Sequence, residues 1–257
     1  MALIHLDFHS DALKMAVNAD IILPQASRSQ IGMEGKREES YRTLYLLHGL
    51  SDDHTIWQRR TSVERYAARY GVAVVMPSGG RSFYTDMRHG GAYYTYIAKE
   101  LPAVCRSFFA GMSASPADQY IAGLSMGGYG AWKIAMREGN FAGAASFSGA
   151  LDVYRLASHT ALDDRTYWED IFGDVEGILG SQEDAYALTE AAHRAGKLPK
   201  KLYLSCGTED SLLRDTRRMR DLLTEKNIPC EYREATGNHN WEFWDAELER
   251  AMAYFFA

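Results

Sequence analysis

Two segments near the start of the chain alternate between apolar and polar residues, as strands do when one face turns toward a core. They cover residues 3–10 and 13–23. The apolar side chains of the second segment recur at every other position and share one face: Met15, Val17, Ala19, Ile21 and Leu23. This pattern predicts that the chain opens with two strands. A polar stretch over residues 25–40 is predicted to form a loop or the tip of a hairpin.

From residue 43 onward the pattern changes to short apolar runs separated by longer segments with helical spacing. Continuous apolar runs are typical of strands that are buried on both faces, as in parallel sheets. The predicted strands cover residues 43–47, 72–76, 119–122, 143–149, 201–206 and 230–234. The predicted helices cover residues 62–70, 93–109 with a kink near Pro102, 128–137, 183–194, 213–226 and 241–255. This alternation predicts an α/β fold with a mostly parallel central sheet and helices on both faces.

The length of 257 residues suits a single α/β domain, and the chain contains no internal repeat, low-complexity tract or interdomain linker. We therefore predict one domain over residues 1–257. Residues 151–180 have no clear period and carry three aromatic side chains: Tyr154, Tyr167 and Trp168. We expect this segment to form a small cap region over a functional site.

Composition and charge argue against several classes of partner. The net charge is -6, so a surface that binds nucleic acid is not expected. No apolar run approaches the roughly 20 residues that cross a membrane. The three cysteines, Cys105, Cys206 and Cys230, share no metal-ligand spacing, and their odd number fits a reducing compartment better than a disulfide framework. We therefore expect a cytoplasmic protein without a bound metal.

The segment of residues 123–127, Gly-Leu-Ser-Met-Gly, carries the strongest chemical signal. It lies between a predicted strand and a predicted helix, and a sharp turn there would expose the hydroxyl of Ser125 as a nucleophile. Glycines two residues to either side suit such a turn, because larger side chains would collide with the neighbouring strand and helix. The pentapeptide alone also fits a glycine-rich turn whose serine only caps the helix.

A serine nucleophile needs a base and an acid that orients the base, and in a parallel sheet both lie on loops at the carboxyl ends of strands. Among the eight histidines, His239 best meets this requirement, because it lies between the last predicted strand and the last helix. The acid is expected after the strand that ends at residue 206. Asp210 is our first candidate, Glu209 the reserve, and Asp152 a weaker alternative.

The oxyanion of a tetrahedral intermediate needs two N–H donors that are already in place. Met126 follows the nucleophile and offers its backbone amide at the start of a helix. The loop after the strand of residues 43–47 is expected to supply the second donor, and our candidate is the backbone amide of Leu50. In chain order the predicted triad is Ser125, Asp210, His239, which is the order found in α/β-hydrolases.

Five ordered motifs, spread over nearly the whole chain, resemble the esterase D family of α/β-hydrolases, which includes S-formylglutathione hydrolases, feruloyl and acetylxylan esterases, and mycolyltransferases. The motifs begin at residues 48, 123, 148, 207 and 237: His-Gly-Leu-Ser-Asp with Trp57 following, Gly-Leu-Ser-Met-Gly-Gly-Tyr-Gly-Ala, Ser-Gly-Ala-Leu-Asp, Gly-Thr-Glu-Asp and Gly-Asn-His-Asn-Trp. The resemblance implies an α/β-hydrolase fold. It also implies Ser125 as nucleophile, His239 as base and Asp210 as the orienting acid. Within the family the chain looks most similar to bacterial tributyrin esterases.

These observations predict a serine carboxylesterase that cleaves short-chain acyl esters through an acyl-enzyme, with no cofactor. The aromatic residues Trp57, Tyr84 and Trp241 are expected either to line the substrate pocket or to pack in the core. Alternative functions are hydrolysis of S-formylglutathione, removal of acetyl or feruloyl groups from carbohydrate, acyl transfer, and binding without catalysis. The expected partner is a small-molecule ester, and the sequence leaves the formation of a homo-oligomer open.

Overall fold

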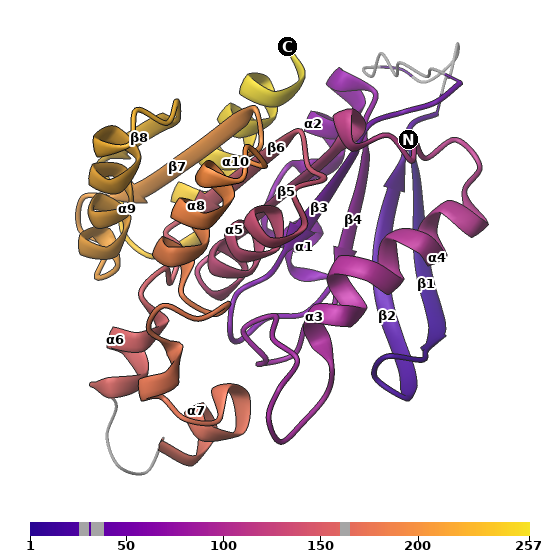
Figure 1. Cartoon of the computed structure of the whole chain (residues 1–257). Helices are drawn as coiled ribbons and strands as arrows, with labels where there is room; N and C mark the ends of the chain where they lie inside the picture. The colour runs from indigo at the N-terminus through magenta and orange to yellow at the C-terminus, as the bar shows by residue number, and fades with distance from the viewer. Residues whose placement is uncertain (26–30, 32–38, 160–164) are drawn as a thin grey trace.

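The computed structural model describes residues 1–25, 31, 39–159 and 165–257. These residues form an eight-stranded sheet in the order β1-β2-β4-β3-β5-β6-β7-β8 (Figure 1). The strands are β1 (Ala2–Ser10), β2 (Met15–Leu23), β3 (Thr43–Leu47), β4 (Ala73–Pro77), β5 (Gln119–Leu124), β6 (Gly143–Phe147), β7 (Lys201–Gly207) and β8 (Glu231–Ala235). Most of the loop predicted over residues 25–40 lies outside the described residues.

The pairing of the strands confirms the predicted α/β-hydrolase fold. β1 and β2 form an antiparallel hairpin in which Ala2 pairs with Leu23, and β2 is also antiparallel to β4. Every neighbouring pair from β4 through β3, β5, β6 and β7 to β8 is parallel. All residues of β3 and β4 are buried, as expected for strands covered on both faces.

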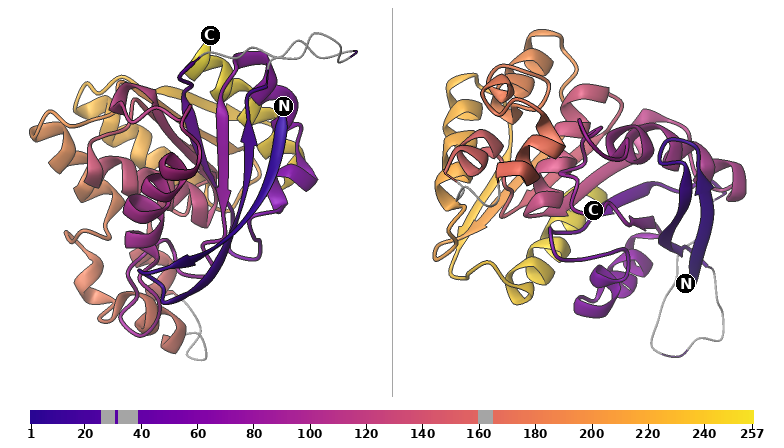
Figure 2. Two further views of the ribbon diagram at one scale, coloured as in Figure 1. Left: turned by 90° about the vertical axis from the view of Figure 1, so that its right-hand side faces the viewer. Right: turned by 90° about the horizontal axis from the view of Figure 1, so that it is seen from below.

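Helices cover both faces of this sheet and create two hydrophobic clusters. The helices are α1 (Ile56–Arg60), α2 (Val63–Tyr70), α3 (Tyr93–Thr95), α4 (Leu101–Phe108), α5 (Met126–Glu138), α6 (Val153–Ser158), α7 (Arg165–Phe172), α8 (Ala185–Arg194), α9 (Leu213–Glu225) and α10 (Trp241–Phe256). The apolar residues of α1, α2 and α10 form one cluster against the sheet. Those of α4, α5, α8 and α9 form the other cluster on the opposite face (Figure 2).

The helix predicted over residues 93–109 differs in detail from expectation. It runs without a break, but residues Tyr96–Glu100 form a π-helical turn between α3 and α4. Pro102 lies just after this turn and has no N–H to donate to the preceding turn of a helix. The wider turn thus lies where the sequence predicted a kink, since a π-turn is a common local adjustment to a missing helical hydrogen bond. The short helix α1 had no counterpart among the predicted elements.

The carboxyl ends of the parallel strands meet at one edge of the sheet, at the bottom of Figure 1. Helices α6 and α7 lie beyond this edge, within the segment that the sequence marked as a cap. Residues 160–164 of that segment lie outside the described residues. Three loops reach the same edge: the β5–α5 turn, the β7–α9 loop and the β8–α10 loop. The predicted nucleophile, acid and base lie one on each of them.

Candidate active site

Ser125 lies at a sharp turn between β5 and α5, as the strand–turn–helix pattern predicted. Its backbone has φ 54° and ψ -120°, a left-handed conformation that is costly for a residue with a side chain. Hydrogen bonds to β6 and to the loop after it hold Ser125 there. The Ser125 N–H donates to the Phe147 carbonyl over 2.9 Å, and the Ser125 carbonyl accepts from the Ala150 N–H over 3.0 Å. The turn presents the hydroxyl at the carboxyl edge of the sheet.

The glycines on either side of Ser125 have the steric role that the sequence predicted. A Cβ on Gly123 would lie 2.4 Å from the carbonyl oxygen of Gly127. A Cβ on Gly127 would lie 2.4 Å from the carbonyl oxygen of Leu47 in the neighbouring strand. Both contacts are with backbone atoms, which cannot move aside as a flexible side chain can. The close approach of β5, β3 and α5 therefore requires glycine at both positions.

The structure brings Ser125, His239 and Asp210 together from three separate loops. The Nε2 atom of His239 lies 3.0 Å from the Ser125 hydroxyl oxygen, and Nδ1 lies 2.8 Å from the Asp210 carboxylate. A carboxylate only accepts hydrogen bonds, so Nδ1 carries the ring proton and its N–H donates a hydrogen bond to Asp210. In the neutral ring Nε2 is then the acceptor for the serine hydroxyl. This arrangement is able to take the proton of Ser125 and to return it to a leaving group.

The surroundings of Asp210 keep its carboxylate ionised. Its side chain is fully buried, and burial alone would raise its pKa. Hydrogen bonds from the His239 ring, the Leu212 N–H at 2.9 Å and the Ser148 hydroxyl outweigh burial and place the pKa of Asp210 below its ordinary value. A charged group at this position orients the imidazole and can stabilise the imidazolium that forms when His239 takes a proton.

The other two candidate acids have different partners. Glu209 is exposed, and its carboxylate accepts a hydrogen bond from the Gly237 N–H over 3.1 Å. Asp152 caps α6 by accepting from the Arg155 N–H over 3.0 Å, and it pairs with Arg218. Of the three carboxylates, Asp210 is the one that the structure places on the His239 ring.

The two segments that were predicted to supply oxyanion donors both lie beside Ser125. Met126 is the first residue of α5, so its N–H has no carbonyl one helical turn earlier to bond. The loop after β3 passes beside Ser125: a Cβ on Gly49 would lie 3.8 Å from the Cβ of Ser125. Leu50 follows Gly49 in this loop. The structure thus brings both predicted donor segments to the serine, and the role of their amides stays a prediction.

Comparison with known families agrees with this geometry. A model of the esterase family matches residues 10–255. The chain belongs to the esterase family. It is accordingly a carboxylic-ester hydrolase, and the enzyme class predicted from the sequence is confirmed.

Individual relatives support the same assignment. An acetyl esterase of Caldicellulosiruptor saccharolyticus is 31% identical over 99% of this chain and 98% of its own length. The substrate-bound structure of FphF, fluorophosphonate-binding serine hydrolase F of Staphylococcus aureus, matches with a TM-score of 0.89 and 34% identity over 100% of this chain and 98% of its own. The S-formylglutathione hydrolase FrmB of Staphylococcus aureus matches with a TM-score of 0.86 and 34% identity over 100% and 99%. The resemblance to the esterase D family is thereby confirmed.

The three aromatic residues considered for the substrate pocket of the esterase lie in different surroundings. Trp57 is fully buried, and its indole N–H donates to the Leu47 carbonyl over 3.1 Å. Tyr84 is also fully buried. Core packing, the alternative interpretation, accounts for both side chains. Trp241 is half-buried and packs edge-on against Trp57 with ring centroids 5.2 Å apart, so it alone of the three remains a candidate for the pocket wall.

Two residues of the esterase that contact the triad had not been singled out from the sequence. Trp244 packs edge-on against the His239 ring with centroids 4.8 Å apart, which restricts the orientation of the imidazole. Ser148 is buried, has φ 47°, and donates its hydroxyl to Asp210. The sequence held a signal for each: Trp244 follows the helix-capping Asn240 by one helical turn, and Ser148 opens one of the five motifs.

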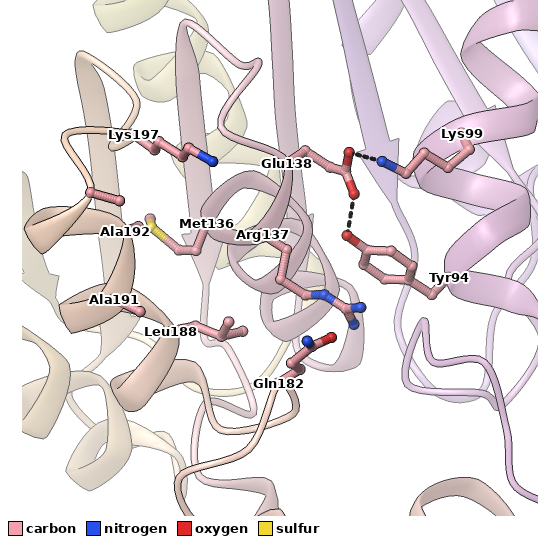
Figure 3. A pocket seen from close by; sticks show the side chains of 11 residues that line it. Tyr94, Lys99, Met136, Arg137, Glu138, Gln182, Leu188, Ala191, Ala192 and Lys197 are labelled. Atoms are coloured by element: carbon pink, nitrogen blue, oxygen red, sulfur yellow. Dashed lines mark hydrogen bonds and ion pairs between the residues drawn. The ribbon is translucent and has the colours of Figure 1, made fainter.

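A pocket of about 510 Å³ lies away from these residues, between the end of α5 and helix α8 (Figure 3). Its polar side is an ion-pair cluster in which Glu138 accepts hydrogen bonds from Lys99 and Tyr94. The guanidinium of Arg137 lies over the Tyr94 ring, 3.8 Å from its centroid. The pocket contributes no residue to the group around Ser125.

The described part of the esterase contains no group of three or more His, Cys, Asp and Glu side chains placed to hold a metal ion. Among the same residues, no helix has both the length and the apolar character that a membrane span requires.

Proposed function

We propose that the protein is a serine carboxylesterase that hydrolyses short-chain acyl esters through an acyl-enzyme intermediate. The observation that carries this proposal is the contact of His239 with both Ser125 and Asp210, at 3.0 Å and 2.8 Å, on a strained turn that exposes the serine hydroxyl. Nucleophile, base and orienting acid are the three groups that a hydroxyl nucleophile needs at neutral pH.

In the proposed reaction the Ser125 oxygen attacks the ester carbonyl carbon while Nε2 of His239 takes the hydroxyl proton. The tetrahedral intermediate collapses, its bond to the alcohol oxygen breaks, and His239 returns the proton to the departing alkoxide. A water molecule then attacks the acyl-enzyme, again losing a proton to His239, and the acid is released as Ser125 regains its hydrogen. Asp210 holds the ring and stabilises its positive charge in both halves.

The backbone N–H groups of Leu50 and Met126 are the proposed oxyanion donors. Both belong to segments that meet beside Ser125, and α5 also directs the positive end of its dipole toward the developing charge. Each such donor is typically worth about 10²–10³ in rate.

Two observations bear on the substrate. The acetyl esterase that is 31% identical over nearly the full length of both chains supports a short acyl group. The S-formylglutathione hydrolase that is 34% identical supports thioester cleavage as a second candidate, because a thioester carbonyl is attacked by the same serine chemistry. Trp241 is the proposed aromatic wall of the pocket, and helices α6 and α7 are the proposed cap within the same single domain. We also propose that the protein resembles tributyrin esterases in its specificity, that it is cytoplasmic, and that its partner is a small-molecule ester.

A substrate series tests this proposal. We expect kcat/KM to be largest for p-nitrophenyl acetate or butyrate and to fall at least about tenfold for the octanoate, because each acyl pocket accepts a limited volume. S-Formylglutathione and acetylated xylan, assayed beside the esters, separate thioester and carbohydrate specificity. A preference for either over the simple esters would replace the short-chain assignment, and failure to cleave any of the substrates would remove the proposed hydrolysis.

A further inference from the structure

The side chain of His48 is buried directly beneath the loop that carries the proposed oxyanion donor. Its Nδ1 lies 2.7 Å from the Gly49 carbonyl oxygen, and the Gly79 N–H donates to its Nε2 over 2.8 Å. A carbonyl can only accept and an amide N–H can only donate, so Nδ1 carries the proton and the ring is neutral. Burial is the main cause that lowers the pKa of His48, which favours the same neutral form.

The contact with Gly49 determines where the next amide points. The carbonyl oxygen of Gly49 and the N–H of Leu50 belong to one planar peptide group and point in opposite directions. The Gly49 oxygen accepts a hydrogen bond from Nδ1 of His48 and another from the Asp52 N–H over 3.3 Å. Holding the oxygen therefore also fixes the direction of the Leu50 N–H, in a loop that passes beside Ser125.

Tyr84 fixes the same loop from a second direction. Its hydroxyl donates to the His48 carbonyl over 2.9 Å, and its side chain is fully buried. The ring lies directly on α5: a Cβ on Gly130 would lie 2.3 Å from it. Tyr84 thus connects the loop after β3 with the helix that begins immediately after Ser125.

The turn that carries Tyr84 is strained and is tied to α5. Phe83 and Tyr84 are consecutive non-glycine residues with φ 48° and 52°. Lys133 of α5 is fully buried and donates to the Phe83 carbonyl over 3.2 Å, to the Thr85 hydroxyl over 2.7 Å and to the Glu183 carboxylate over 2.6 Å. A left-handed conformation at a residue with a side chain persists only where the surroundings enforce it, and such strain gathers at functional sites.

We propose that His48 and Tyr84 are positioning residues that orient the Gly49–Leu50 peptide, so that the Leu50 N–H is held ready for the oxyanion. The inference rests on the proposed function and assigns a role to two side chains that do not touch the substrate. The Nδ1–H of His48 supplies the orientation, and Tyr84 keeps the His48 backbone at a constant distance from α5.

A matched pair of substitutions separates the two nitrogens of His48. In His48→Asn the amide nitrogen can take the place of Nδ1 and donate to Gly49. In His48→Gln the amide group reaches the place of Nε2 and leaves the Gly49 carbonyl without this donor. We expect His48→Gln to lower kcat on p-nitrophenyl butyrate by about 10²-fold with KM changed less than about threefold, because a displaced oxyanion donor acts on the transition state. His48→Asn is expected to retain kcat within about tenfold of wild type.

Tyr84→Phe removes only a hydroxyl and keeps the ring that packs on α5, so it tests the proposal without depending on how a substituted His48 folds. We expect kcat to fall about tenfold and the affinity for n-butylboronic acid, which forms a tetrahedral adduct on the serine, to fall by a similar factor. Tyr186→Phe is the control, because Tyr186 is also nearly buried and donates to a backbone carbonyl, that of Asp215, over 3.1 Å. It should leave kcat and boronate affinity unchanged.

The proposal is overturned if Tyr84→Phe leaves kcat and boronate affinity at the level of Tyr186→Phe, or if His48→Asn and His48→Gln lower kcat equally. It is also overturned if the losses appear in KM alone. These outcomes differ from a failure of the proposed function, which would appear as retained turnover in the Ser125→Ala variant. With Ser125→Ala inactive and Tyr84→Phe fully active, the esterase mechanism stands and only the positioning role is lost.

Discussion

Ser125→Ala is expected to lower kcat for p-nitrophenyl butyrate by about 10⁶-fold. The remaining rate is the one that substrate binding and oxyanion stabilisation support without a nucleophile. The substitution removes the one hydroxyl that the His239 ring faces at 3.0 Å, and no covalent intermediate can then form at this position. The fold should survive, because the turn at residue 125 is held by backbone hydrogen bonds to Phe147 and Ala150. Steady-state kinetics, with circular dichroism to check folding, measure both expectations.

Ser146→Ala is the matched control for this loss. Ser146 is a fully buried serine of the adjacent strand β6, and its hydroxyl has no hydrogen-bond partner among the described residues. Removing that hydroxyl should leave kcat within about twofold of wild type, as is usual for a change outside the reacting groups. Turnover in Ser125→Ala comparable to that of Ser146→Ala would exclude Ser125 as the nucleophile.

Asp210→Asn is expected to cost about 10⁴-fold in kcat while leaving KM nearly unchanged. An asparagine amide at this position can donate to Nδ1 of His239, which moves the ring proton to Nε2 and removes the acceptor for the serine hydroxyl. The pKa of Asp210 lies below its ordinary value, so the wild-type carboxylate is ionised at every pH above about 5. Titration of Asp210 itself should therefore add no pH dependence to this deficit between about pH 6 and pH 9 in a pH–rate profile.

Glu209→Gln is the companion variant for this test. Glu209 is the neighbouring carboxylate, and a glutamine oxygen can still accept the hydrogen bond from the Gly237 N–H. It should keep kcat within about threefold of wild type. A larger loss in Glu209→Gln than in Asp210→Asn would transfer the orienting role to Glu209 and contradict the geometry described here.

Much of the fold follows from local sequence patterns. The run of residues 43–47 matches β3 without a shift, and the segment predicted as a strand over residues 230–234 shifts by one residue in β8. β3 is recognisable because a strand inside a parallel sheet has apolar side chains on both faces. β8 lies at the edge of the sheet and is only partly buried, so its bounds are less sharply marked. Helix α1 was not predicted, because its five residues are too few for a helical period to appear. The π-turn before Pro102 is a local adjustment whose position the missing N–H of the proline indicates only approximately.

The candidate site was predictable to the extent that topology determines it. Loops at the carboxyl ends of parallel strands must share one edge, so Ser125, Asp210 and His239 can be placed together without any distance being known. The surroundings of these residues were not predictable in the same way. Trp57 and Tyr84 were considered for a pocket, yet both are fully buried. Proximity to a site in the sequence does not determine whether a large aromatic side chain faces the pocket or packs in the core.

Covalent labelling with a fluorophosphonate, followed by peptide mass spectrometry, tests the central claim most directly: the Ser125 hydroxyl is activated by the His239 ring. The related FphF is itself described as fluorophosphonate-binding. We predict a single phosphonyl group, carried by the peptide that contains Ser125, and a labelling rate that falls by several orders of magnitude in His239→Ala. Label on a different serine, or equally fast labelling of Ser125 without His239, would contradict the account.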